Sequence, residues 1–192
     1  LNLGIDSDNT SLAFTQTWVN KLSQHYEKID VITLRLGDRY KLNENVNLYY
    51  INTKNSNKSK IEQIIALYKI SKKLINNNEY VHCFAHMAPL QHLIAKYFLY
   101  RNQINTTLWF THAGPKFGIK WIILWLSSYL ANNIVTASKY SFPFKFKNLI
   151  ITGHGINFDK FYQNKENYEL KNFLILSRIS KSKNIDNTLE NF

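Results

Sequence analysis

The chain has only one cysteine, Cys83, and few acidic residues. A lone cysteine cannot form an internal disulfide, so a disulfide-stapled secreted fold is excluded and a reducing compartment is favoured. The 13 acidic residues are outnumbered by 24 basic residues, and the net charge is +11. A surplus of this size indicates an anionic partner, such as nucleic acid, a lipid head group or a phosphorylated small molecule.

Arginine and long apolar runs are also scarce. Only four arginines occur and the lysines are spread along the chain, which disfavours nucleic-acid binding because arginine is the better base and phosphate reader. The longest apolar run, Trp121–Ala131, is too short to span a bilayer. It predicts a buried helix. The alternative is a helix at a membrane surface, with Phe117, Trp121 and Trp125 in line.

Familiar catalytic and metal motifs are missing. The sequence has no G-x-S-x-G elbow, no P-loop and no G-x-G-x-x-G. His82 and His86 have a spacing that suits a metal on a helix, but here they fall along an expected strand, about 13 Å apart. We therefore expect no metal site there. Cys83 lies in the middle of the same strand and is interpreted as a small core residue.

What the sequence does contain is a globular composition and an alternating pattern. It is 45% hydrophobic and 15% aromatic over 192 residues, enough for one full domain and the beginning of a second. Expected strands and helices alternate as far as Thr152, which predicts an open, doubly wound α/β domain with a parallel sheet and helices on both faces. The expected strands are 29–36, 46–52, 80–86, 106–112, 133–138 and 148–152, and the expected helices are 10–24, 60–75, 90–100 and 118–130.

Polar and small residues follow these strands. His86 comes after one strand, Thr111–Pro115 with His112 after the next, Ser138 after a third, and Gly153–Asn157 after the last. Ligands of doubly wound domains bind beyond the carboxyl ends of the strands. We therefore expect the chain ends after Phe84, Phe110, Ala137 and Thr152 to lie together on one edge and to form the site.

Four segments together resemble retaining family-4 glycosyltransferases of the GT-B fold. "WFTHAGP" is similar to the family strand that ends in a histidine before a small-residue loop, and "IVTASKYS" to its strand that ends in a serine. "ITGHGINFDKF" resembles the "PNGVD…F" segment that leaves the first domain. "FLILSRISKSKN" resembles the "F-x-G-R-x-x-x-x-K-G" segment that begins the second. This sequence departs from the last two family patterns at four residues, His154, Asn157, Ser177 and Asn184.

The resemblance implies a domain plan. Residues 1–161 would form the Rossmann-like acceptor domain, 162–172 the interdomain linker, and 173–192 the truncated start of the nucleotide-sugar donor domain. The family's first strand would precede Gly4, and only "LNL" remains of that strand here. We therefore expect the sequence to be a fragment of a longer protein and to be inactive by itself. The expected activity is transfer of a sugar from a nucleotide sugar to a glycan or lipid-linked glycan, with retention of configuration.

The resemblance also assigns roles. Arg178 and Lys183 would stabilise the charge that grows on the leaving diphosphate, with Gly155 also at the donor phosphates. His112 would contact the transferred sugar. Gly155 is expected to adopt a positive φ or to allow a close backbone approach. The acceptor side would be formed by Asp8, Asn9, Thr10 and His86.

No cofactor or metal is expected, because the nucleotide sugar is a substrate, and no nucleic acid is expected as a partner. The expected location is cytoplasmic, with possible peripheral attachment to the inner face of the cytoplasmic membrane through a membrane-associated acceptor.

Two alternatives remain open at this point. One is a basic Rossmann-like module that binds nucleic acid or an anionic membrane, for which Lys139–Lys147, "KYSFPFKFK", gives the best support by interleaving cations with aromatic residues. The other is a different GT-B enzyme, such as a sugar epimerase, which would need catalytic carboxylates outside this sequence.

Overall fold

The computed structural model describes residues 1–8, 14–53, 55–56, 58–77, 79–153, 155 and 185. Leu1–His154 forms one compact unit, and Gly155–Phe192 is a second unit of which only Gly155 and Ile185 are described. The expected linker at 162–172, and all but Ile185 of the expected donor-domain start at 173–192, therefore lie outside the described residues.

The described chain has seven strands, and every strand pair is parallel. They form a three-stranded sheet in the order β1-β2-β3 and a four-stranded sheet in the order β4-β5-β6-β7. The predicted α/β class and the predicted parallel pairing are confirmed. The strands are β1 (Asn2–Ile5), β2 (Ile29–Leu36), β3 (Val46–Thr53), β4 (His82–His86), β5 (Asn105–Trp109), β6 (Asn133–Thr136) and β7 (Leu149–Ile151).

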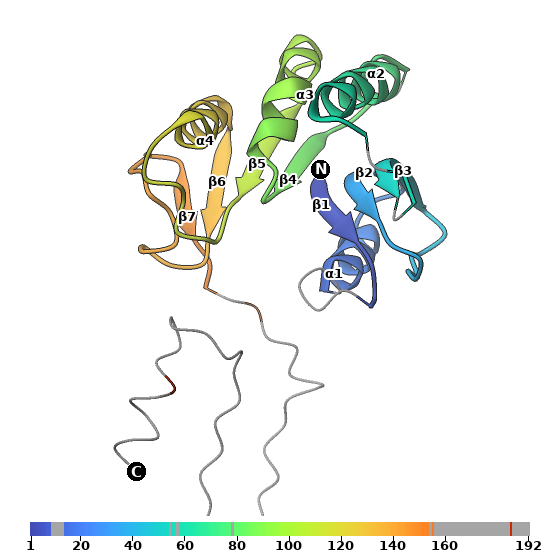
Figure 1. Ribbon diagram of the computed structural model, residues 1–192, viewed down its shortest axis with the longest axis horizontal. Helices are drawn as coiled ribbons and strands as arrows, with labels where there is room; N and C mark the ends of the chain where they lie inside the picture. The colour runs from blue at the N-terminus through green and yellow to red at the C-terminus, as the bar shows by residue number, and fades with distance from the viewer. Residues whose placement is uncertain are drawn as a thin grey trace, which may run out of the picture. The chain divides into compact units, whose positions relative to one another are not determined.

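Leu1 joins the two sheets. Its backbone nitrogen donates to the Phe84 carbonyl at 2.8 Å, and its carbonyl accepts from the His86 N–H at 2.8 Å. The start of β1 therefore lies beside β4, while β1 itself pairs with β2 (Figure 1). The strand order thus reverses between β1 and β4, as in doubly wound domains.

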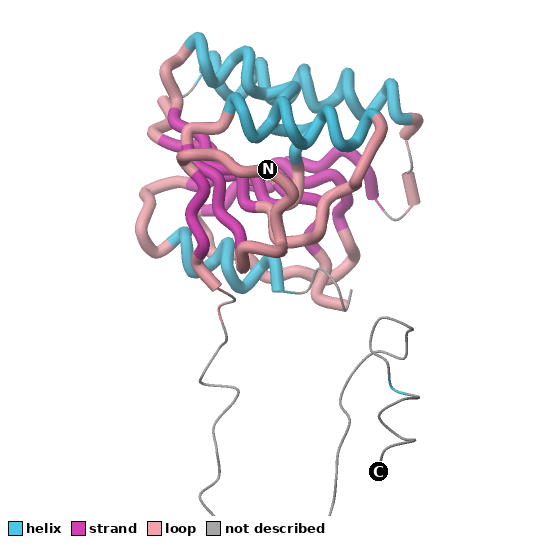
Figure 2. Tube along the Cα trace, turned by 90° about the vertical axis from the view of Figure 1, so that its left-hand side faces the viewer, coloured by secondary structure: helices cyan, strands magenta, loops and turns pink. Residues whose placement is uncertain are grey.

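Helices cover both faces of the sheets, as predicted. α2 (Lys60–Asn77), α3 (Pro89–Arg101) and α4 (Ile119–Leu130) form a row on one face, and α1 (Phe14–Ser23) lies on the other (Figures 1 and 2). Local chemistry sets two of the helix starts. Ser59 and Glu62 form a reciprocal capping box at α2, because the Ser59 N–H donates to Glu62 Oε2 and the Glu62 N–H donates to Ser59 Oγ. Pro89 opens α3, where its missing N–H costs nothing.

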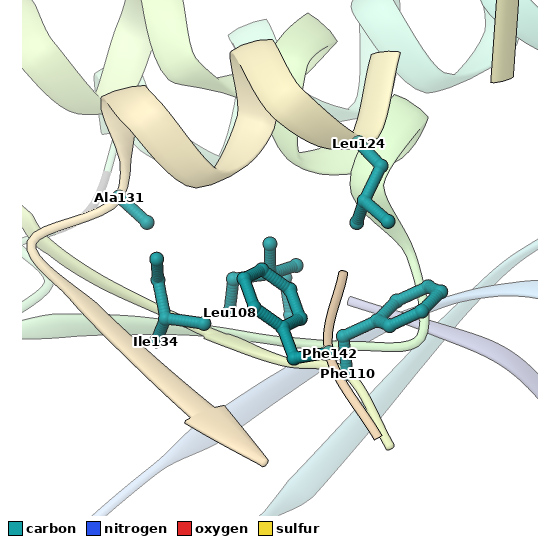
Figure 3. Close-up of a cluster of buried hydrophobic side chains, with 7 residues drawn as sticks. Leu108, Phe110, Leu124, Ala131, Ile134 and Phe142 are labelled. Carbon is teal, nitrogen blue, oxygen red and sulfur yellow. The ribbon is translucent and has the colours of Figure 1, made fainter. Parts of the chain in front are cut away.

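The core of the second sheet lies beneath α4. Leu108 and Ile134 of the sheet and Leu124 of α4 are at most 1% exposed and pack together with Phe110 and Phe142 (Figure 3). Full burial of one such side chain stabilises the fold by about 1.5–3 kcal/mol. This cluster fixes β5, β6 and the loop after β6 against one helix, and so fixes the carboxyl ends of those strands.

Two expectations from the sequence need correction. We expected only the three residues before Gly4 to remain of the first strand. Instead, β1 runs from Asn2 to Ile5 and includes Gly4. The segment 121–131 is not a buried helix, because on α4 only Leu124, Ser127 and Ser128 are buried. Within the described residues, no helix is both long and apolar enough to cross a membrane.

Candidate functional site

The candidate site lies at the carboxyl edge of the sheets, where the strand order reverses. All described strands are parallel, so the segments after β1, β4, β5, β6 and β7 leave from the same edge. The predicted gathering of the ends after Phe84, Phe110, Ala137 and Thr152 on one edge is therefore confirmed. Backbone hydrogen bonds reinforce it, because the Phe110 N–H donates to the Val135 carbonyl at 3.0 Å and the Thr152 N–H to the Thr136 carbonyl at 2.9 Å.

His86 is the last residue of β4 and is buried among aromatic rings. Its ring centroid lies 4.6 Å from that of Trp109, 5.5 Å from Trp18 and 5.6 Å from Phe14. Burial, together with smaller contributions from the Leu1 amine and His112, lowers the pKa of His86 to about 4. The imidazole is therefore neutral at pH 7, so it can exchange hydrogen bonds with a hydroxyl group but does not act as a cation.

His112 lies in the exposed loop after β5 and is brought near His86. β5 pairs with β4 with Trp109 opposite His86, so His112 follows three residues beyond that pair at the same edge. Met87 ties this loop to β4, because its backbone N–H donates to the Trp109 carbonyl at 2.8 Å and its Sδ accepts from the Thr111 N–H at 3.3 Å. The structure thus joins one neutral buried histidine and one exposed histidine at neighbouring strand ends.

Met87 itself was not anticipated from the sequence. Its φ is 53°, in the left-handed region that residues with a Cβ rarely occupy. Such backbone strain concentrates at functional sites because the surrounding structure must hold it in place. Methionine has no preference for this conformation, so no signal in the sequence could have revealed it.

Asp8, the expected acceptor residue after β1, is exposed and already has partners. Its N–H donates to Asp6 Oδ1 at 3.0 Å, and its carboxylate lies 3.6 Å from Arg39 Nε. Asp6 lies directly over Gly37 after β2, where an added Cβ would come within 2.1 Å of the Asp6 Cγ. The Asp6–Gly37 contact was not predicted from the sequence, although a glycine that follows a strand is a recognisable signal.

The other expected residues are placed as follows. Asn9, Thr10, Arg178 and Lys183 lie outside the described residues. Gly155 is exposed, and an added Cβ would meet nothing within 4 Å. The positive φ expected at Gly155 is therefore wrong, because in this turn it is Gly153 that has a positive φ, of 76°. The close backbone approach expected at Gly155 stays a prediction.

Ser138, which follows β6, stabilises its own turn. Its Oγ lies 2.7 Å from Ser141 Oγ and accepts a hydrogen bond from the Tyr140 N–H at 3.3 Å. The hydroxyl thus has partners within the turn and fixes where the chain leaves the edge.

A cavity of about 670 Å³ lies at the opposite end of the sheets, lined by Tyr26–Ile32, Tyr80–Phe84 and parts of α1. β1 pairs with β2 only from Thr33 onward, and in the described chain this cavity lies beside the start of β2, which pairs with β3 but not with β1. No expected site residue that the structure describes lines it. We interpret it as a gap in the sheet and not as the site.

His82 and Cys83 both border this cavity. The His82 ring lies 3.0 Å from the Thr107 hydroxyl, and burial raises the pKa of the Cys83 thiol and keeps it protonated. Cys83 packs against the core beneath α3, as predicted for a small core residue. Among the described residues, no group of three or more histidine, cysteine, aspartate or glutamate side chains could hold a metal ion.

Comparison with known proteins found no matching family model, curated protein or solved structure.

Proposed function

We propose that the Leu1–His154 unit is the acceptor-binding domain of a retaining nucleotide-sugar glycosyltransferase of the GT-B fold. The observation that carries the proposal is that His86 and the loop with His112 follow the adjacent strands β4 and β5 at the edge where the strand order reverses. Ligands of doubly wound domains bind at this position. The retaining stereochemistry and the donor domain come from the sequence resemblance alone.

The chemistry of the edge suits an uncharged polyhydroxy ligand. A neutral His86 offers one donor and one acceptor, and His112 is exposed beside it. Phe14, which is 48% exposed and lies 5.6 Å from the His86 ring, adds an apolar surface next to these polar groups. A sugar ring presents both hydroxyls and C–H faces, so this mixture fits an acceptor glycan better than it fits a phosphate.

The competing nucleic-acid module loses its main support. In the stretch Lys139–Lys147, the Phe142 ring is buried and the Phe144 ring packs against Trp121 at 5.1 Å. Rings held in this way are not free to stack on bases, which is how such segments bind single strands. The lysines of the stretch remain exposed, so an anionic partner is still favoured.

The proposal is tested by titrating the 192-residue chain with simple glycosides and with glycolipids in detergent. The imidazole resonances report binding, and the chain has six histidines. We expect His86 and His112 to shift together, whereas His82, bonded to Thr107 near the opposite end of the sheets, does not. Shifts centred on His82, or no shift of His86 and His112 with any glycan, would contradict the proposed site.

A further inference from the structure

α4 has the reverse of the usual amphipathic pattern. Its buried positions are Leu124 and two serines, Ser127 and Ser128. A surface helix normally turns its apolar stripe inward and its polar residues outward. Here large apolar side chains are exposed instead, by 38% to 68%: Ile119, Ile122, Trp125, Leu126, Tyr129 and Leu130.

These residues form one continuous surface. At 100° per residue they fall on a single arc of the helix, and Phe117, in the loop just before it, is 88% exposed. α4 is the last helix of its row, with α3 on one side (Figure 1). We define the α4 surface as Phe117, Ile119, Ile122, Trp125, Leu126 and Tyr129.

The charge around this surface has one sign. Residues 80–158 contain six lysines, one arginine and no aspartate or glutamate. Lys116 and Lys120 flank Phe117 and are exposed, as are Lys139, Lys145 and Lys147 in the loop after β6.

This loop is held beside α4 by its aromatic residues. The Phe144 ring lies 5.1 Å from Trp121 of α4 and 5.7 Å from Phe142, which belongs to the core beneath the helix. The phenylalanines alternate with lysines, so packing of the rings leaves the ammonium groups in solvent. The apolar α4 surface is thereby bordered by cations.

We propose that the α4 surface docks on an anionic lipid bilayer. Bulky apolar and aromatic side chains gain free energy on entering the acyl boundary, and the lysines around them pair with anionic head groups. A nucleic acid would match the charge but would leave the apolar face in water. An acidic protein would match both the positive charge and the apolar face only if its own surface could cover six bulky uncharged side chains.

Docking in this way would place the candidate site next to the membrane. α4 begins just after the loop that carries His112, so its first turn lies at the carboxyl edge of the sheets. A ligand with a lipid tail could then reach that edge from the bilayer. The docking itself does not depend on the proposed sugar chemistry and is tested without any sugar.

The test is flotation of the 192-residue chain with two kinds of vesicle. One kind contains equal parts of phosphatidylglycerol and phosphatidylcholine, and the other contains phosphatidylcholine alone. We expect binding to the anionic vesicles at low salt, weaker binding at high salt because exposed charges are screened, and little binding to phosphatidylcholine.

Matched variants locate the contact. Ile119→Gln and Ile61→Gln each change an isoleucine in the first turn of a helix, exposed by 68% and 71%, but only Ile119 belongs to the α4 surface. We expect Ile119→Gln to lower the partition coefficient roughly tenfold and Ile61→Gln to leave it near the parental value. Lys120→Gln should lower it roughly fivefold, whereas Lys21→Gln on α1, on the opposite face, should not.

Three results would overturn the proposal: no flotation with anionic vesicles at low salt, equal losses for Ile119→Gln and Ile61→Gln, or binding that resists high salt. Sedimentation without lipid tests whether a second copy of the chain binds the α4 surface. If the chain self-associates, and if Gln substitutions in the α4 surface disperse the assembly, this surface is an interface between copies and not a membrane surface. All four substitutions are at exposed positions, and unchanged circular dichroism melting confirms that each variant is folded.

Discussion

The Thr111 backbone N–H lies 3.3 Å from Met87 Sδ, so a thioether that follows β4 holds the loop that follows β5. This contact passes between neighbouring strand ends and holds the loop that carries His112 against the residue that follows β4. The residue with the left-handed φ of 53° is the same one whose Sδ accepts this hydrogen bond, which gives a structural reason for the strained backbone at Met87.

Met87→Leu keeps the volume but removes the sulfur acceptor. We expect a loss of about 1 kcal/mol in the free energy of unfolding, because the half-buried Thr111 N–H loses its partner. The His112 resonance should shift as its loop loosens. Urea denaturation and proton NMR measure the two effects. Thr111→Val is the control, since it keeps the N–H and removes only a hydroxyl at 3.8 Å from the sulfur. If Met87→Leu is as stable as the parent, the thioether does not hold the loop.

The buried Ser127–His92 pair links α4 to α3, and its removal should be costly. His92 Nδ1 lies 2.8 Å from Ser127 Oγ, and His92 Nε2 is already buried without a hydrogen-bond partner among the described residues. Ser127→Ala would leave both ring nitrogens unpaired, so we expect a loss of about 1–3 kcal/mol in the free energy of unfolding. Ser128→Ala is the matched control, because its hydroxyl donates only to the Leu124 carbonyl of its own helix. Equal losses in urea denaturation would mean that the pair has no special role.

Stability should fall in mild acid because two histidines are buried in the neutral form. Burial lowers the pKa of both His86 and His92 to about 4, while an unfolded histidine titrates near 6.5. Between these values the unfolded chain binds more protons, so stability rises with pH there. The stabilisation is complete above about pH 6.5 and is lost as the pH falls toward 4. Between pH 7 and pH 5, each of the two histidines should lower the free energy of unfolding by about 2 kcal/mol.

Urea denaturation of His92→Gln at both pH values checks this. Glutamine does not titrate and still reaches Ser127 with its amide. We expect the variant to lose about 2 kcal/mol less than the parent between pH 7 and pH 5. An identical pH dependence in parent and variant would show that His92 is not buried neutral.

Local patterns predicted most of the fold. The β-branched run at 29–36 is β2 itself, and the apolar periodicity at 60–75 falls within α2. The placement of His86 and His112 after neighbouring strands at one edge was also predictable, because parallel strands bring their carboxyl ends to the same side of a sheet. Each of these features depends on residues close in sequence or on the rule that alternating strands and helices form a parallel sheet.

The orientation of α4 could not be predicted in the same way. Periodicity assigns apolar residues to the inner face, yet Ser127 is inside because His92, 35 residues earlier, offers it a partner. The contact of Met87 with Thr111 also spans 24 residues. Such pairs depend on tertiary packing, which overrides local preference and leaves no pattern within one element.

The transfer reaction itself provides the last prediction. On our proposal, Arg178 and Lys183 stabilise the leaving diphosphate, so in a protein with a complete donor domain Arg178→Ala and Lys183→Ala should each lower turnover by roughly 10²–10³. His112→Ala should also lower turnover, whereas His82→Ala should change it little, because His82 bonds Thr107 near the opposite end of the sheets. Release of nucleoside diphosphate from a panel of nucleotide sugars measures all four variants. The 192-residue chain alone should release none, since electrostatic stabilisation requires cations held in place by a complete domain. Equal turnover by the 192-residue chain and the longer protein would contradict the two-domain mechanism. Unimpaired Arg178→Ala and Lys183→Ala variants would instead contradict the phosphate assignment and leave the acceptor site at His86 and His112 to be judged by its own titration.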